Sequence, residues 1–271
     1  MRGRTAEQSS LVTERPVADI VDRHLLDDIR GEAARVANGA VAAGLQLRLM
    51  GGMAVYLTSP TVRRPPYARE YGDFDFAVAA KDARGAAAYF EAAGYVAEKM
   101  FNALHGAQRL NFQHPNGRWP IDVVVDEVRM SHRIDLRGRI NGPGPTLSLA
   151  DLLLTKLQIW EINAKDLGDI VCLLADHPVT DREASEVIDR QRIVRLTSTD
   201  WGLCHTIERN LRLTAEEARR RVPAEPPFDP TAQVEVLLEA MEVAPKTLGW
   251  QARARVGEHV RWYETPEEVR H

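Results

Sequence analysis

The chain has 271 residues, of which 44% are hydrophobic and 27% are charged, and its formal net charge is -4 at pH 7. This length allows one large domain or two modest ones. No apolar run approaches the roughly 20 residues that span a bilayer, and the negative net charge argues against a protein that attracts nucleic acid over its whole surface.

Two features indicate a cytoplasmic location. Residues 1–16 are polar and lack the apolar segment of a secretory signal. Cys172 and Cys204 lie in helix-like stretches without metal-ligand spacing, so we expect buried free thiols in a reducing compartment. No membrane partner is expected.

The first elements follow from hydrophobic periodicity. Residues 17–43 carry apolar side chains at helical spacing and end at Gly44. Residues 45–50 are apolar at every second position, which is typical of a strand.

A double glycine, Gly51-Gly52, interrupts this strand, and residues 53–57 resume as a short helix. Backbone N–H groups at such a turn can approach a phosphate, and a helix N-terminus favours anions. Residues 58–72 hold three prolines, which predicts a long loop of the kind that lines a site.

Strict alternation of apolar and acidic residues marks the next segment, Asp73 to Val78. Alternate side chains of a strand point to opposite faces, so Asp73 and Asp75 share the face opposite Phe74 and Phe76. Two carboxylates about 6–7 Å apart on one strand can share a divalent cation. An alternative is an exposed edge strand whose acidic residues face water.

A helix over residues 81–93 and a hairpin follow. Residues 108–114 and 119–126 read as strands joined around Asn116-Gly117, the strongest short hairpin signal. Residues 134–140 predict a further strand.

Asp122 and Asp126 share a face of the second hairpin strand. An aspartate inside an Ile/Val-rich strand is destabilising unless its charge is paired or bound to metal. If this strand lies beside Asp73 and Asp75, three carboxylates meet around one or two Mg²⁺. We favour Asp122, because it lies within the strand, while Asp126 ends it.

The Gly- and Pro-rich residues 141–145 mark a change in composition, and the rest reads as helical. Ser148, Thr180 and Thr214 each precede an acidic residue by three positions, a capping-box pattern that opens helices. The sequence therefore predicts an α+β fold: a mixed sheet flanked by helices in residues 1–145, and a helical domain in residues 146–271.

Further charged residues complete the candidate site. Lys156 lies on the first C-terminal helix, where solvation is an ordinary alternative to phosphate binding. Asp166 and Asp169 share a helix face through their i, i+3 spacing.

Arginine clusters occur at 63–64 and 219–221, and the sequence leaves open whether they face solvent or RNA.

Together, Gly51-Gly52, Arg69 before Asp73-x-Asp75, and Asp122 on a later strand resemble the nucleotidyltransferase superfamily with the DNA polymerase β-like fold. Downstream, residues 153–157 and 165–170 are similar to the AbiEii-type branch, which includes nucleotidyltransferase toxins of toxin–antitoxin systems. The resemblance covers roughly residues 40–176. Many members have Gly-Ser where this chain has Gly51-Gly52.

The resemblance implies a role for each matched position. Gly51 and Gly52 would cradle the triphosphate of an NTP, and Lys156 would bind phosphate oxygens. Residues Asp73, Asp75 and Asp122 would hold one or two Mg²⁺. Asp169, beside Asp166, would be a functional acid, and Arg69 would contact phosphate or brace the acidic strand.

The implied activity is transfer of an NMP from an NTP to a hydroxyl, with release of pyrophosphate. An RNA end such as that of tRNA is the favoured acceptor, a small molecule remains open, and an antitoxin is a possible partner protein. Two alternatives stand beside it: an inactive nucleotide- or partner-binding module of the same fold, and a glycosyltransferase, which also uses Asp-x-Asp but explains neither Gly51-Gly52 nor Asp122.

Overall fold

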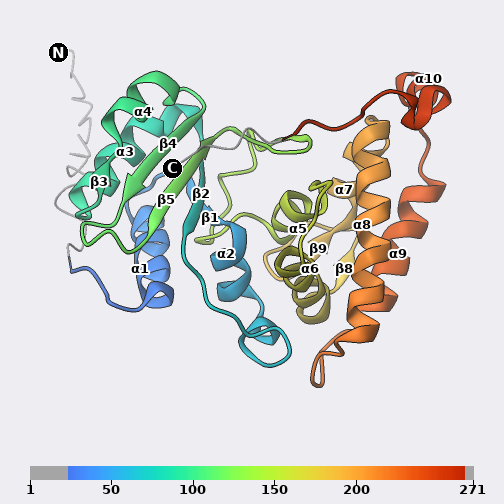
Figure 1. Ribbon diagram of the computed structural model, residues 1–271, viewed down its shortest axis with the longest axis horizontal. Coiled ribbons are helices and arrows are strands. Elements are labelled where there is room, and N and C mark those ends of the chain that lie inside the picture. The colour runs from blue at the N-terminus through green and yellow to red at the C-terminus, as the bar shows by residue number, and fades with distance from the viewer. Residues whose placement is uncertain (1–23, 266–271) are drawn as a thin grey trace, which may run out of the picture.

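The computed structural model describes residues 24–265 and has an α+β architecture. A sheet with its helices forms one side of the molecule, and a bundle of helices forms the other (Figure 1). Within residues 24–265, no helix combines the length and apolar character needed to cross a membrane.

The main sheet has five strands in the order β1-β2-β5-β4-β3. Strands β2 and β5 run parallel, and the other neighbouring pairs are antiparallel. The strands are β1 (Leu47–Met50), β2 (Phe74–Val78), β3 (Val96–Ala97), β4 (Arg109–Gln113) and β5 (Pro120–Val125). The hairpin of β4 and β5 confirms the prediction from Asn116-Gly117, and Gly117 has a φ of +66°.

Four α-helices accompany the sheet: α1 (Ile29–Ala42), α2 (Gly51–Thr58), α3 (Ala83–Ala92) and α4 (Lys99–His105). Short 3-10 helices cover Pro60–Arg63 and Ala80–Asp82. The apolar sheet face packs on α3, where the Phe90 ring lies 5.4 Å from Phe76 and 4.8 Å from Phe112, centroid to centroid. Tyr89, also on α3, donates a hydrogen bond to the Val36 carbonyl of α1 at 2.7 Å.

The C-terminal half is mainly helical, as predicted. Its α-helices are α5 (Leu149–Leu157), α6 (Ala164–Asp176), α7 (Arg190–Thr197), α8 (Trp201–Arg220), α9 (Pro230–Val243) and α10 (Leu248–Val256), followed by a 3-10 turn at Gly257–His259. Two small two-stranded sheets join β6 (Glu127–Arg129) with β7 (Arg133–Asp135) and β8 (Val179–Thr180) with β9 (Ile188–Asp189).

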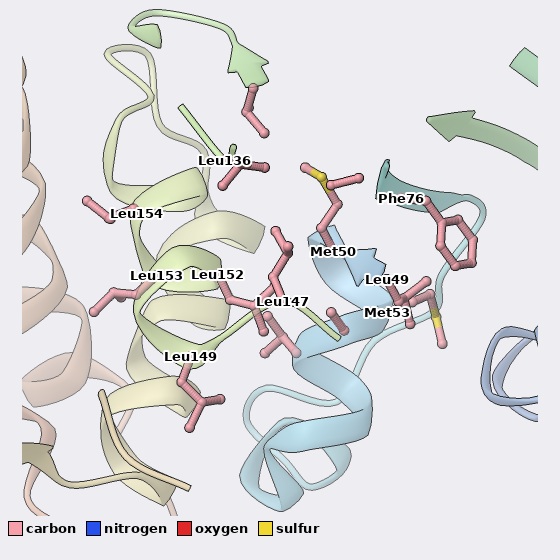
Figure 2. Packing of buried hydrophobic residues seen from close by; sticks show 14 of the residues in the cluster. Leu49, Met50, Met53, Phe76, Leu136, Leu147, Leu149, Leu152, Leu153 and Leu154 are labelled. Atoms are coloured by element: carbon pink, nitrogen blue, oxygen red, sulfur yellow. The ribbon is translucent and has the colours of Figure 1, made fainter. Parts of the chain in front are cut away.

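One hydrophobic cluster contains buried side chains from both halves of the chain. Figure 2 shows Leu147 and Leu152 between α5 and α2, whereas Met53 lies beside Leu49 and Phe76. The segment before α5 also hydrogen-bonds to the edge strand β1. The Leu49 carbonyl accepts from Leu147 N at 3.0 Å, and Leu49 N donates to the Pro145 carbonyl at 2.9 Å. The helical half is thereby anchored beside β1, and the boundary at residue 145 stays a prediction.

Some local predictions were wrong. The short helix includes the double glycine, since α2 begins at Gly51. The helix predicted over 17–43 begins at Ile29, capped by the Asp28 side chain, and residues 17–23 lie outside the described part. The strand predicted over 134–140 ends at Asp135, and the sequence did not indicate β3 or α4.

The capping-box pattern succeeded at one of three positions. The Ser148 side chain accepts from Asp151 N and opens α5. Thr180 instead lies in β8. Thr214 is inside α8, where its hydroxyl donates to the Asn210 carbonyl at 2.7 Å. A Ser or Thr followed three residues later by an acid therefore occurs both at the start of a helix and within a longer helix, and the pattern alone does not distinguish the two.

Candidate active site

Asp75 on β2 and Asp122 on β5 are direct partners in the parallel register of these strands. Neighbouring strands lie about 4.8 Å apart, so the two backbones place these side chains next to each other on one face. The opposite face carries Phe74, Phe76 and Ile121, all buried. The two acidic strands, whose adjacency is an assumption in the interpretation of the sequence, are neighbours in the structure.

Asp73 and Asp126 lie outside the two strands. Asp73 is exposed and directly precedes β2. Asp126 follows β5 with a φ of +61°, and its side chain accepts a hydrogen bond from Ala80 N at 2.8 Å. Asp126 therefore stabilises a turn, and Asp122 is the one placed beside Asp75.

The environment of Asp75 disfavours a negative charge. Burial, reinforced by the charges of Asp73 and Asp122, raises the pKa of Asp75 to about 7, and Lys156 and Arg109 only partly offset this. Within the described chain, no donor hydrogen-bonds to the Asp75 carboxylate. Asp75 is thus a carboxylate without a partner that compensates its charge.

The double glycine has a steric role at this point. Gly51 has a φ of +66°, and a Cβ there would lie 2.1 Å from Asp75 Oδ2. A Cβ on Gly52 would lie 2.5 Å from the Arg69 Nη2. The Arg69 guanidinium therefore fills the space in which a serine side chain at position 52 would begin.

Asp122 is partly neutralised by its neighbours on β4. Arg109 Nε lies 2.5 Å from Asp122 Oδ1. Asn111 is the register partner of Asp122, and its side-chain amide, in the orientation that satisfies both of its polar atoms, donates to Oδ1 at 3.0 Å. Sequence reasoning missed Arg109 and Asn111, although their alternation in the first hairpin strand places both on the polar face.

Lys156, Asp166, Asp169 and Arg69 form an ion-pair network between α5, α6 and the loop before β2. Lys156 Nζ lies 2.5 Å from Asp166 Oδ1 and 3.1 Å from Asp169 Oδ2. Arg69 Nη2 lies 3.0 and 2.9 Å from the two Asp169 oxygens. The predicted common face of Asp166 and Asp169 is confirmed, because both reach the same ammonium group.

This network is largely shielded from water. The Asp169 side chain is 1% exposed and the Lys156 side chain 12%, so the solvated alternative for Lys156 was wrong. Burial alone would lower the pKa of Lys156, but Asp169 and Asp166 outweigh it and raise the pKa above its usual value. Arg69 also lies over the Tyr71 ring, at 4.1 Å from Cζ to the centroid.

The chemistry of the donor set fits a hard divalent cation. Asp75 and Asp122 offer adjacent carboxylates, and the crowded negative charge at Asp75 is the kind that such a cation relieves. In residues 24–265, however, no group of three or more His, Cys, Asp or Glu side chains is arranged to hold a metal ion. The convergence of Asp73 with the other two therefore stays a prediction.

Cys172 on α6 lies close to the ion-pair network, since burial and the charge of Asp169 together raise the pKa of its thiol. Cys172 and Cys204 are both buried and free, as predicted. Burial raises the pKa of Cys204 to about 12, so its thiol is unreactive at neutral pH.

Comparisons with known proteins add no family assignment. No protein-family model matches the chain, and a search of curated proteins gives no significant match.

Proposed function

We propose that the protein is a metal-dependent nucleotidyltransferase, which transfers an NMP from an NTP to a hydroxyl acceptor and releases pyrophosphate. The observation that carries this proposal is the register pairing of Asp75 with Asp122 beside the Gly51 turn. Two adjacent carboxylates, one of them without a compensating partner, are suited to one or two Mg²⁺ that neutralise phosphate charge during in-line transfer.

Each side chain has a task in this proposal. Asp75 and Asp122 hold the metal, assisted by Asp73 from the start of β2. The N-terminus of α2 at Gly51 and Gly52 offers backbone N–H groups to the triphosphate. Lys156 contributes positive charge from the side of α5, held in place by Asp166 and Asp169.

Arg69 serves the site indirectly in this scheme. Its pairing with Asp169 connects the loop before β2 to α6, so it positions the acidic strand against the helical half. RNA ends are the favoured acceptors, and small molecules remain an alternative. A cytoplasmic location and an antitoxin partner belong to the same proposal.

A second candidate is a module of the same fold that binds nucleotides or a partner protein without turnover. The Arg109–Asp122 ion pair favours it, because an arginine on the carboxylate competes with a metal for the same oxygen. The absence of a three-carboxylate cluster within residues 24–265 agrees with it.

Pyrophosphate release from each common NTP with Mg²⁺ distinguishes the two. Wild type and Asp73→Ala/Asp75→Ala are compared with total small RNA, an aminoglycoside panel or no acceptor, and Asp135→Asn serves as a control on an exposed acid. Release that requires one acceptor and disappears only in the double variant supports transfer. Mg-NTP binding without release under every condition supports the non-catalytic module.

A further inference from the structure

The loop that follows the first arginine cluster, at residues 66–67, meets the second cluster at Arg221. Tyr67 donates a hydrogen bond from its hydroxyl to the Arg221 carbonyl at 2.5 Å, and the Arg221 guanidinium donates to the Pro66 carbonyl. The same guanidinium lies over the Tyr67 ring, at 4.9 Å from the centroid. The loop after α2 and the end of α8 lie on the same side of the molecule (Figure 1).

A pocket of about 150 Å³ opens where these segments meet the start of α6. Its lining includes Tyr67, Arg69, Lys165, Asp169 and Arg221. Asp169 belongs to both this pocket and the candidate active site, because it pairs with Arg69 and with Lys156. The pocket therefore adjoins the candidate active site across one ion-pair network.

Positive charge gathers around this pocket. We define the junction patch as Arg64, Arg69, Lys165, Arg219, Arg220 and Arg221. The acids on the same segments are Glu70, Asp166, Asp169, Glu216 and Glu217. Six cations against five acids leave an excess of one positive charge in a protein with a net charge of -4.

The members of the patch differ in how their charge is compensated. Arg220 and Arg221 pair with Glu217, and Arg69 pairs with Asp169. Arg64, Lys165 and Arg219 are exposed, and no carboxylate of the described residues forms an ion pair with any of them. The Arg69 Nε is buried without a hydrogen-bond partner among the described residues.

We propose that the junction patch binds the phosphodiester backbone of a single nucleic-acid strand and leads that strand to the candidate active site. This inference rests on the proposed function, because it identifies the acceptor as a nucleic acid. Guanidinium groups bind phosphate oxygens through paired hydrogen bonds. The cations come from three separate segments and extend beyond one pocket, so they match a series of phosphates better than a single anion.

Binding of labelled nucleic acid tests the inference without requiring turnover. The probes are a short fluorescein-labelled single-stranded RNA and the DNA of the same sequence, followed by fluorescence anisotropy. The patch variant is Arg64→Gln/Lys165→Gln/Arg219→Gln. The control is Arg84→Gln/Arg182→Gln/Arg255→Gln, which removes the same charge from exposed positions elsewhere that form no ion pair with described residues. Circular dichroism melting checks that both remain folded.

We expect wild type and control to bind the RNA with the same salt dependence. The patch variant should lose about three phosphate contacts, which lowers the slope of log affinity against log salt by about 2 and weakens binding about tenfold at low salt. Comparison of the RNA with the DNA of the same sequence shows whether the 2′-hydroxyl contributes to the binding affinity.

Three results overturn the inference: no salt-dependent binding by wild type, equal binding by the patch variant, or equally tight binding of polyglutamate, which would assign the patch to an acidic protein. These results can be distinguished from a failure of the proposed transferase function. RNA binding that depends on the patch without pyrophosphate release refutes transfer alone, and release with unchanged RNA binding in the patch variant refutes the patch alone.

Discussion

Asp75 and Gly51 are in such close contact that a Cβ on Gly51 would lie 2.1 Å from Asp75 Oδ2. The turn after β1 and the acidic residue of β2 therefore depend on each other. The glycine allows a φ of +66°, and it leaves the space that the carboxylate occupies.

Gly51→Ala should lower the free energy of unfolding by more than the cost of the left-handed backbone, which is about 1–2 kcal/mol. The matched control is Gly44→Ala, because Gly44 has a φ of +72° and no atom within 4 Å of its Cβ position. Urea unfolding of both variants separates the steric clash from the backbone strain. Equal losses would show that Asp75 does not limit the turn.

Asp75→Asn should stabilise the metal-free protein at about pH 8 and have little effect at about pH 4. The folded protein raises the pKa of Asp75 to about 7, whereas an unfolded chain has about 3.9. Between these values the folded state binds the proton more tightly, so the contribution of Asp75 to stability falls as the pH rises. Above the folded pKa, the wild type carries an unfavourable, partly buried charge beside Asp73 and Asp122 that asparagine lacks.

Thermal unfolding with EDTA at both pH values measures this effect. Asp135→Asn is the control with the opposite sign, because the hydrogen bond from Arg137 lowers the pKa of Asp135. A higher Tm for Asp75→Asn at both pH values would contradict the titration of Asp75.

Asp169→Asn should reduce the free energy of unfolding by about 3–5 kcal/mol, the usual loss when one partner of a buried ion pair is removed. Its side chain is 1% exposed and faces both Arg69 and Lys156. Loss of the carboxylate leaves Asp166 as the remaining acid for two cations. The comparison is Asp135→Asn, whose exposed pair with Arg137 should contribute no more than about 1 kcal/mol.

Guanidinium denaturation, followed by circular dichroism, gives both values. A small loss at Asp169, similar to that at Asp135, would mean that the network is accessible to water and contributes little to holding α5, α6 and the loop together.

Much of the fold was predictable because it depends on local patterns. The alternation around Asp75 gave the buried and polar faces of β2, and Asn116-Gly117 gave the hairpin that brings β5 into the sheet. The interpretation of Asp122 as the neighbour of Asp75 followed once the two strands were assumed to be adjacent.

The parts that could not be predicted depend on contacts distant in sequence. The burial of Lys156 requires α6 to pack on α5, and the meeting of Gly52 with Arg69 requires the path of the loop between them. The loop after the first arginine cluster is joined to the second cluster through Tyr67 and Arg221, which are 154 residues apart. No periodicity or capping rule carries this information.

Arg109→Gln should strengthen Mg²⁺ binding if Asp122 belongs to a metal site. Arg109 Nε lies 2.5 Å from Asp122 Oδ1, so the guanidinium competes with a cation for that oxygen and repels it by charge. Because the Arg109 side chain is 38% exposed, glutamine should be accommodated without loss of the fold.

Isothermal titration calorimetry at about pH 8, where Asp75 is ionised, should show that Arg109→Gln binds Mg²⁺ more tightly than wild type. Arg133→Gln, which removes an exposed arginine paired with Glu127, should leave the affinity unchanged. Weaker binding in Arg109→Gln would instead assign Arg109 to holding Asp122 in its binding orientation, and equal binding in both variants would place the metal away from Asp122.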